Sequence, residues 1–224
     1  MSMSPPDLPE TIPALAAYRD WAAVYDSNEN RTRDLDAICL MAAGLPLAGA
    51  CVIELGAGTG KNTAHLARHA ARIMAMDLSP EMLARARERG LGEHVRFIEH
   101  DIMQDWPVEA GAADIVVGNL VLEHVRELGP VLIRAARALR PGGQLYLSEL
   151  HPFRQLRGSQ ARFDRADGSA ARVEAYYHGV SDYLAAAAAA GLSLLKLDEP
   201  IEDGRTISAE TPPRLLVLQF VKTA

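Results

Sequence analysis

Between residues 51 and 150 the sequence alternates short apolar runs with longer amphipathic stretches, and this alternation constrains the fold more than any other feature. The short runs have the length and β-branching of buried strands, and the stretches between them have helical spacing. Strands that are apolar throughout and separated by helices form a parallel sheet covered on both faces. We therefore predict a doubly wound α/β fold with strands in the segments 50–56, 72–77, 95–101, 113–119, 144–150, 192–199 and 214–221.

The segments outside this alternation predict a division of the chain into two parts. Residues 1–46 are expected to form a proline-rich tail, loose over its first dozen residues, and a helical segment. Residues 47–224 are expected to form the main α/β domain, in which the segment 151–178 breaks the alternation as an insertion. Within the insertion, a turn signal at Asp167-Gly168 between two alternating runs predicts a hairpin.

Ligands of doubly wound sheets bind beyond the carboxyl ends of the strands, where this chain carries the glycine loop Gly56-Ala57-Gly58-Thr59-Gly60. A phosphate-binding P-loop is excluded, because Leu55 stands where its first glycine would be and Asn62 replaces the hydroxyl residue. A dinucleotide loop is disfavoured but not excluded, since the third glycine comes one position early. Glu54, near the strand end, is unfavourable beside a diphosphate and suits a cationic ligand.

The chain resembles the class I S-adenosylmethionine-dependent methyltransferases, in particular the small-molecule group related to the ubiquinone/menaquinone C-methyltransferases. The resemblance is good over about residues 50 to 150 and lies in the motifs ELGAGTG, MAMDLSPEML, EHDIMQ, NLVLEHV and LRPGGQLYLSE, which follow one another in order. It implies a Rossmann-like seven-stranded sheet whose last strand is antiparallel, with an N-terminal helical lid within residues 1–46 and a substrate-facing insertion at 151–178, after strand five. The implied cofactor is S-adenosyl-L-methionine, with S-adenosyl-L-homocysteine as product.

By this resemblance, Asp77 would accept hydrogen bonds from both ribose hydroxyls, and Asp101 would accept one from the adenine amino group. Leu78 and Ile102 would pack against the two faces of the adenine ring. Tyr25 and Arg33 of the lid are candidates to close over the methionine part, although an ordinary amphipathic helix explains them equally well. The other positions expected to contact the cofactor are Glu54, Gly56, Ala57, Gly58, Met82, Asn119 and Leu120.

The acceptor is expected to be a small molecule. Asn119 is followed by Leu-Val-Leu rather than the Pro-Pro-aromatic sequence of DNA base-amino methyltransferases, and the formal net charge of −6 disfavours nucleic acid as a partner. His151 and His178 are candidate catalytic residues, although a structural cap beside Pro152 explains His151 equally well. Arg154 and Tyr177 are candidate substrate-binding residues, with the arginine suited to a carboxylate or phosphate.

Other features limit the remaining possibilities. No metal site is expected, because His65 and His69 share a helix face without a third ligand. The two isolated cysteines fit a reducing cytoplasm, and no apolar run is long enough to span a bilayer. The sequence does not indicate the oligomeric state. Two alternative functions stay open: a protein that binds the cofactor without catalysis and, with less support, a dehydrogenase that uses NAD.

Overall fold

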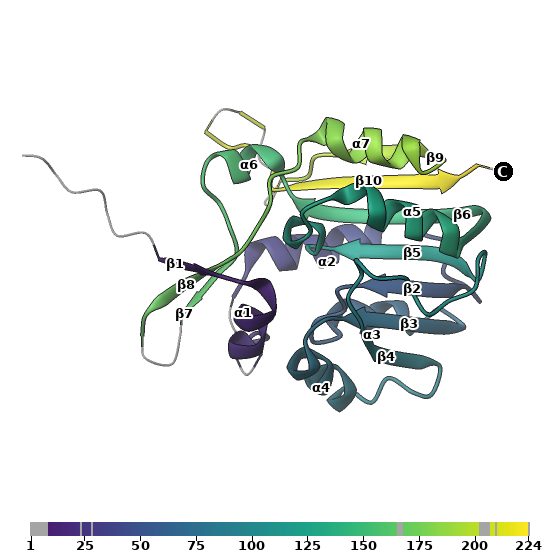
Figure 1. Cartoon of the computed structure of the whole chain (residues 1–224), viewed down its shortest axis with the longest axis horizontal. Coiled ribbons are helices and arrows are strands. Elements are labelled where there is room, and N and C mark those ends of the chain that lie inside the picture. Colours follow the sequence, from purple (N-terminus) through teal and green to yellow (C-terminus); the bar gives the residue numbers. More distant parts are fainter. Residues whose placement is uncertain are drawn as a thin grey trace, which may run out of the picture.

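The computed structural model describes residues 9–22, 24–27, 29–164, 168–201, 207–208 and 210–223. Within these residues the main sheet contains seven strands, in the order β4-β3-β2-β5-β6-β10-β9 (Figure 1). Adjacent strands are parallel except at β10, which is antiparallel to both of its neighbours. The predicted doubly wound fold with an antiparallel last strand is confirmed. The strands are β2 (Cys51–Leu55), β3 (Arg72–Asp77), β4 (Val95–Glu99), β5 (Ala113–Asn119), β6 (Leu139–Leu150), β9 (Leu192–Asp198) and β10 (Leu215–Lys222).

Helices cover both faces of this sheet, as near-continuous apolar strands require. On one face, α5 (Leu128–Ala138) and α7 (Val180–Ala189) bury Leu132 and Tyr183 against the sheet. On the other face, α2 (Arg31–Ala42) and α3 (Lys61–Leu66) bury Leu40 and Leu66. A further helix, α4 (Pro80–Glu88), packs against β3 and β4.

Local capping explains where two of these helices begin. The Ser79 hydroxyl accepts a hydrogen bond from the backbone N–H of Met82, and Pro80 occupies the first position of α4. The Asn30 side chain likewise accepts hydrogen bonds from the N–H groups of Thr32 and Arg33 at the start of α2.

A small second sheet lies beside the main body and carries the N-terminal segment (Figure 1). It has the order β1-β8-β7, formed by β1 (Glu10–Ile12), β8 (Ala170–Val173) and β7 (Arg162–Asp164). The prediction of a loose tail over the first dozen residues is therefore wrong for residues 10–12. Their partner in the parallel pairing is β8, far along the chain, so no local pattern marks them as a strand. The antiparallel pairing of β7 with β8 confirms the hairpin, while Asp167 of its turn lies outside the described residues.

The lid helix α1 (Ala14–Trp21) packs against the small sheet rather than against the main one. The Trp21 ring stacks on the Phe163 ring of β7, with centroids 5.3 Å apart and an interplanar angle of 15°. A short helix, α6 (Pro152–Leu156), follows β6 and leads into the small sheet. In the described part of the chain, no helix combines the length and the apolar character needed to cross a bilayer.

Candidate functional site

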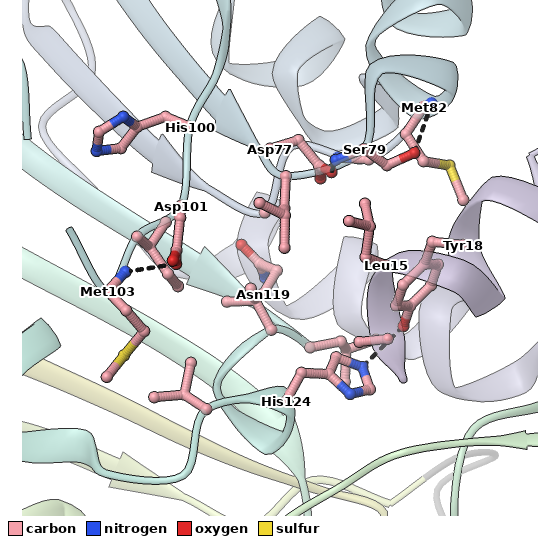
Figure 2. Close-up of a pocket in the computed structure, with 18 of the residues that line it drawn as sticks. Leu15, Tyr18, Asp77, Ser79, Met82, His100, Asp101, Met103, Asn119 and His124 are labelled. Atoms are coloured by element: carbon pink, nitrogen blue, oxygen red, sulfur yellow. Dashed lines mark hydrogen bonds between the residues drawn. The ribbon is translucent and has the colours of Figure 1, made fainter. Parts of the chain in front are cut away.

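The carboxyl ends of β2, β3 and β5, together with the segment after β4, surround a cavity that we call the strand-end cavity (Figure 2). Because parallel strands end on the same edge of a sheet, residues distant in sequence meet here. Ten of the thirteen residues predicted to contact the cofactor line this cavity: Tyr25, Gly56, Gly58, Asp77, Leu78, Met82, Asp101, Ile102, Asn119 and Leu120.

Asp77 is held in one orientation by the backbone around it. One carboxylate oxygen accepts a hydrogen bond from the N–H of Gly58 at 2.7 Å, and the other accepts from the N–H of Ser79 at 2.8 Å. A carboxylate oxygen can accept more than one hydrogen bond, so both atoms can still accept from a ligand. Burial raises the pKa of Asp77 above its ordinary value, and these backbone N–H groups oppose that shift.

The glycine loop requires glycine at the two positions that line the cavity. At Gly56, with φ of +66°, an added Cβ would lie 2.5 Å from a methyl carbon of Val121. At Gly58, with φ of +53°, an added Cβ would meet no atom within 4 Å, and it would extend into the space beside the loop. A side chain is therefore excluded by collision at the first position, and by the left-handed backbone at both.

One part of the cavity wall combines apolar side chains with polar side chains next to them. Leu78 is 45% exposed and Ile102 is 8% exposed, and both line the wall. Asp101 accepts a hydrogen bond from the N–H of Met103 at 2.9 Å, which fixes its carboxylate beside them. The Nε2 atom of His100, also on this wall, is buried and has no hydrogen-bond partner among the described residues.

Asn119, at the end of β5, is oriented by a buried acid that the sequence analysis did not identify. Its side-chain nitrogen donates to Asp36 at 2.6 Å, and Asn62 donates to the other oxygen of Asp36 at 3.0 Å. The side-chain oxygen of Asn119 is buried and has no hydrogen-bond partner among the described residues. A buried acceptor without a partner is costly, and the residue that carries this one lines the strand-end cavity.

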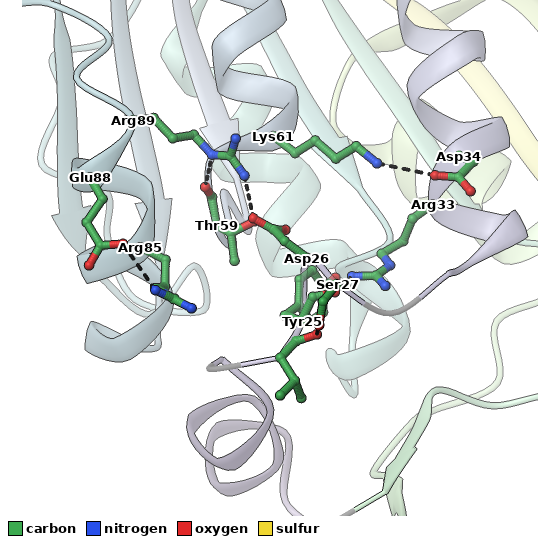
Figure 3. A network of polar contacts seen from close by, with 11 residues as sticks. Tyr25, Asp26, Ser27, Arg33, Asp34, Thr59, Lys61, Arg85, Glu88 and Arg89 are labelled. Carbon is green, nitrogen blue, oxygen red and sulfur yellow. Dashed lines mark hydrogen bonds and ion pairs between the residues drawn. The ribbon is translucent and has the colours of Figure 1, made fainter.

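The segment between α1 and α2 is tied to the glycine loop by a polar network (Figure 3). The Asp26 carboxylate accepts from the Thr59 hydroxyl at 2.7 Å and from the Arg89 guanidinium at 2.5 Å. Arg89 also donates to the backbone oxygen of Thr59 at 2.5 Å. These contacts fix the segment that follows α1 to the glycine loop, and Tyr18 and Tyr25 of this part of the chain line the strand-end cavity.

Tyr18 and His124 form a hydrogen-bonded pair on this wall (Figure 2), with 2.8 Å between the phenol oxygen and Nε2 of the ring. The other ring nitrogen, Nδ1, lies 2.7 Å from the backbone oxygen of Glu174. A carbonyl oxygen only accepts, so Nδ1 donates and Nε2 of the neutral ring accepts from Tyr18. His124 belongs to the motif NLVLEHV, but the sequence analysis did not identify it as a site residue.

Two residues predicted to contact the cofactor lie behind the loop rather than on the cavity wall. Glu54 is 2% exposed and accepts a hydrogen bond from the Thr63 hydroxyl of α3 at 2.6 Å. Burial raises the pKa of Glu54 to about 8. Ala57 is buried in the core that includes α2 and α3. The buried positions of Glu54 and Ala57 suit residues that support the glycine loop from behind. Direct contact of either residue with a ligand stays a prediction.

A second cavity, which we call the arginine cavity, lies between the lid and the small sheet. It shares Tyr18, Tyr25 and Leu120 with the strand-end cavity, so the two spaces adjoin. Arg33, predicted to contact the cofactor, lines this second cavity and stacks on the Tyr25 ring, with 4.0 Å from its guanidinium carbon to the ring centroid. Arg154, predicted to bind substrate, also lines it.

The structure places the other predicted acceptor-site residues away from both cavity walls. The ring of His151 caps α6 by accepting from the N–H of Phe153, and its Nε2 lies 2.9 Å from a carboxylate oxygen of Glu199. His178 is buried, with Nε2 2.7 Å from the backbone oxygen of Val125. Tyr177 is 51% exposed. Their catalytic or substrate-binding roles stay predictions, and the arrangement of His151 favours the capping alternative.

A sheet of this strand order, with a glycine loop after β2 and acids after β3 and β4, is the arrangement that the resemblance to class I S-adenosylmethionine-dependent methyltransferases implied, and the comparisons support that class. Residues 53–147 match the family described as methyltransferase domain. The enzyme class and the cofactor predicted from the sequence are confirmed. A similar solved structure is titled DhpI–SAH complex, with 25% identity, a TM-score of 0.71 and coverage of 94% of this chain and 95% of that one.

Two relatives are similar in sequence. An uncharacterised methyltransferase of Emericella nidulans is 29% identical over 229 residues, a match that covers 84% of this chain and 79% of the relative. A ubiquinone biosynthesis O-methyltransferase of Xanthomonas oryzae pv. oryzae is 37% identical over 114 residues, which is 50% of this chain and 47% of that enzyme. This chain therefore spans only about half of the Xanthomonas enzyme, although it spans most of the Emericella protein.

Proposed function

We propose that this protein transfers the methyl group of S-adenosylmethionine to a small-molecule acceptor that enters through the arginine cavity. The observation that carries the proposal is the junction of the two cavities at Tyr18, Tyr25 and Leu120. A donor in the strand-end cavity and an acceptor in the arginine cavity would meet at these side chains. The relative from Xanthomonas, named for ubiquinone biosynthesis, supports a small-molecule acceptor.

The lining of the strand-end cavity fits the proposed donor. Asp77 would accept from the ribose hydroxyls, and Asp101 from the adenine amino group, with Leu78 and Ile102 against the ring. The buried oxygen of Asn119 lacks a partner among the described residues and would accept from the ammonium of the methionine part. When bound, S-adenosylmethionine supplies a methyl group on a positively charged sulfur.

The N-terminal part of the chain would act as the lid of this site. Residues 1–46 were predicted as tail and lid, and α1 with the segment to Asp26 covers the strand-end cavity. Methyl transfer by single displacement requires alignment of the acceptor and exclusion of water more than acid or base catalysis. The Asp26–Thr59–Arg89 contacts would keep the lid closed during that alignment.

The Tyr18–His124 pair is the best-placed group for a proton released by the acceptor. The phenol of Tyr18 lines both cavities and hydrogen-bonds to Nε2 of His124. Burial raises the pKa of Tyr18 well above its ordinary value, so the phenol alone is a poor base. The tyrosine would pass the proton of a hydroxyl or ammonium acceptor to Nε2 of His124, as Nδ1 keeps its hydrogen bond to Glu174.

Asp77 allows a direct test of the donor site. We expect Asp77→Ala to weaken S-adenosylhomocysteine binding by roughly 2–3 kcal/mol, because it removes a charged partner of two hydroxyls. Calorimetric titration measures this loss, with Asp105→Ala as the control, since Asp105 pairs with Arg134 on the surface away from the cavity. Equal affinity of Asp77→Ala and the parent would refute the ribose assignment. Binding of NAD in place of S-adenosylhomocysteine would refute the proposed function.

A further inference from the structure

The arginine cavity gathers positive charge from five separate parts of an acidic chain. Its volume is about 660 Å³, and its wall includes only two acids, Glu29 and Glu123, in the described part of the chain. The formal net charge of the whole chain is −6, so this concentration of cations runs against the overall composition. The arginines of the wall are Arg31 and Arg33 of α2, Arg154 of α6, Arg157 that follows it, Arg162 of β7, Arg172 of β8, and Arg214 before β10.

Two of these arginines are directly opposite each other across the hairpin. Arg162 of β7 is the register partner of Arg172 of β8, and both line the cavity. Like charges in directly opposite positions of an antiparallel pair destabilise it. Within the described residues, neither guanidinium has a carboxylate at ion-pair distance. A bound anion between them would supply the negative charge that the described residues do not place beside them.

Neighbouring contacts keep the arginines of the opposite wall in place. The Arg154 guanidinium donates to the backbone oxygens of Pro213 at 3.0 Å and Pro212 at 3.1 Å. Arg214 donates to the Thr32 hydroxyl at 3.0 Å. These contacts fix the orientation of both guanidinium groups, and preorganised guanidinium forks suit bidentate binding of oxyanions.

Resting on the proposed function above, we propose that the methyl acceptor is an anionic small molecule, whose carboxylate or phosphate group is held between Arg162 and Arg172. The anion would sit in the arginine cavity while the acceptor atom reaches Tyr18, which lines both cavities. The hairpin is then the element that selects the acceptor. Neutral molecules with the same acceptor group would be poor substrates, because nothing in them compensates the opposed arginines.

The test uses the full chain loaded with S-adenosylhomocysteine and two anionic probes, inorganic phosphate and malonate. Calorimetry and thermal unfolding are followed for the parent, Arg162→Gln and Arg172→Gln. Arg96→Gln serves as the control. Arg96 is exposed on β4, an edge strand of the main sheet, and it does not line the arginine cavity. We expect at least one probe to bind the parent and the control and to raise their Tm. We expect the Kd of that probe to rise about tenfold or more in each hairpin variant.

The unliganded Tm provides a second readout that does not depend on the choice of probe. Removing one of two opposed positive charges should leave the Tm of Arg162→Gln and Arg172→Gln equal to that of the parent or higher. Binding of phosphate alone would indicate a phosphorylated acceptor, and binding of malonate alone a carboxylic acid.

The proposal fails if neither probe binds the parent, or if all four proteins bind the probes equally. A lower unliganded Tm in both hairpin variants would also contradict it, since it would mean that the arginines are structural. S-adenosylhomocysteine binding is measured on the same samples. If it is intact while the anions fail to bind, the donor site stands and only the anionic acceptor is refuted. If it is absent, the proposed function fails, and the anion titration of the unloaded protein still decides the nature of the arginine cavity.

Discussion

At the scale of single residues, two buried acids that do not line the strand-end cavity hold the residues around it. Asp36 is 3% exposed and fixes Asn119, and Glu54 supports the glycine loop through Thr63. Burial raises the pKa of both carboxyls. The sequence analysis did not predict these supporting roles. A single sequence shows which residues end a strand, but it does not show which buried partner a side chain contacts.

The Tyr18–His124 pair gives a prediction for catalysis. For an acceptor whose reacting atom carries a proton, we expect His124→Gln and Tyr18→Phe to lower kcat roughly tenfold to a thousandfold. The Kd of S-adenosylhomocysteine should change little. Stopped assays of S-adenosylhomocysteine release measure kcat, with His69→Gln as the control, because His69 is exposed and follows the end of α3. An unchanged kcat in both variants would remove the pair from the mechanism.

Glu54 gives a prediction for stability. Because its folded pKa of about 8 exceeds the ordinary value of 4.5, the folded protein retains a proton that the unfolded chain loses. The contribution to stability is thus complete below pH 4.5 and declines as the pH rises to about 8. The free energy of unfolding of the parent should therefore fall as the pH rises from 5 to 8. We expect the fall in Glu54→Gln to be smaller than that in the parent by roughly 2–4 kcal/mol. Urea titrations at both pH values measure the difference, and parallel losses would contradict the assignment.

At the scale of elements, the small sheet is the part of the fold that the sequence predicted least well. The hairpin of β7 and β8 has its own turn signal, but β1 is defined only by its parallel pairing with β8. The arginine cavity was missed for the same reason, since its arginines alone come from five separate parts of the chain. The turn signal at Asp167-Gly168 was the local feature that could have shown Arg162 opposite Arg172, because the position of a turn sets the register of its hairpin.

The stacking of Trp21 on Phe163 connects the lid to this sheet and gives a prediction for its closure. Phe163 is 4% exposed, and we expect Phe163→Ala to destabilise the lid by roughly 2–4 kcal/mol through the loss of buried contacts. Amide hydrogen exchange over residues 14–21 should then accelerate while exchange in β2 and β5 stays slow. Leu156→Ala is the matched control, because Leu156 is 68% exposed on α6. Unchanged exchange in α1 would show that the small sheet does not hold the lid.

At the scale of the whole molecule, the strand order explains why the residues of the strand-end cavity could be predicted from the sequence. In a parallel sheet all strand ends meet on one edge, so Asp77, Asp101 and Asn119 could be brought together from their positions in the motifs alone. The arginine cavity depends on how α1, the hairpin and the segment before β10 pack, which no periodicity encodes. The same fold also occurs in a structure titled as the [4+2]-cyclase SpnF, at 18% identity and a TM-score of 0.70, so the fold alone does not define the reaction.

The most direct test of the account follows the methyl group itself. The parent protein is incubated with S-adenosylmethionine labelled in its methyl group and a metabolite extract, and the products are separated by size and then by charge. We predict that the label moves to a low-mass, anionic product, and that this transfer falls about tenfold or more in Arg172→Gln. Label that remains in S-adenosylmethionine, or that moves to protein, nucleic acid or a neutral molecule, would contradict the account.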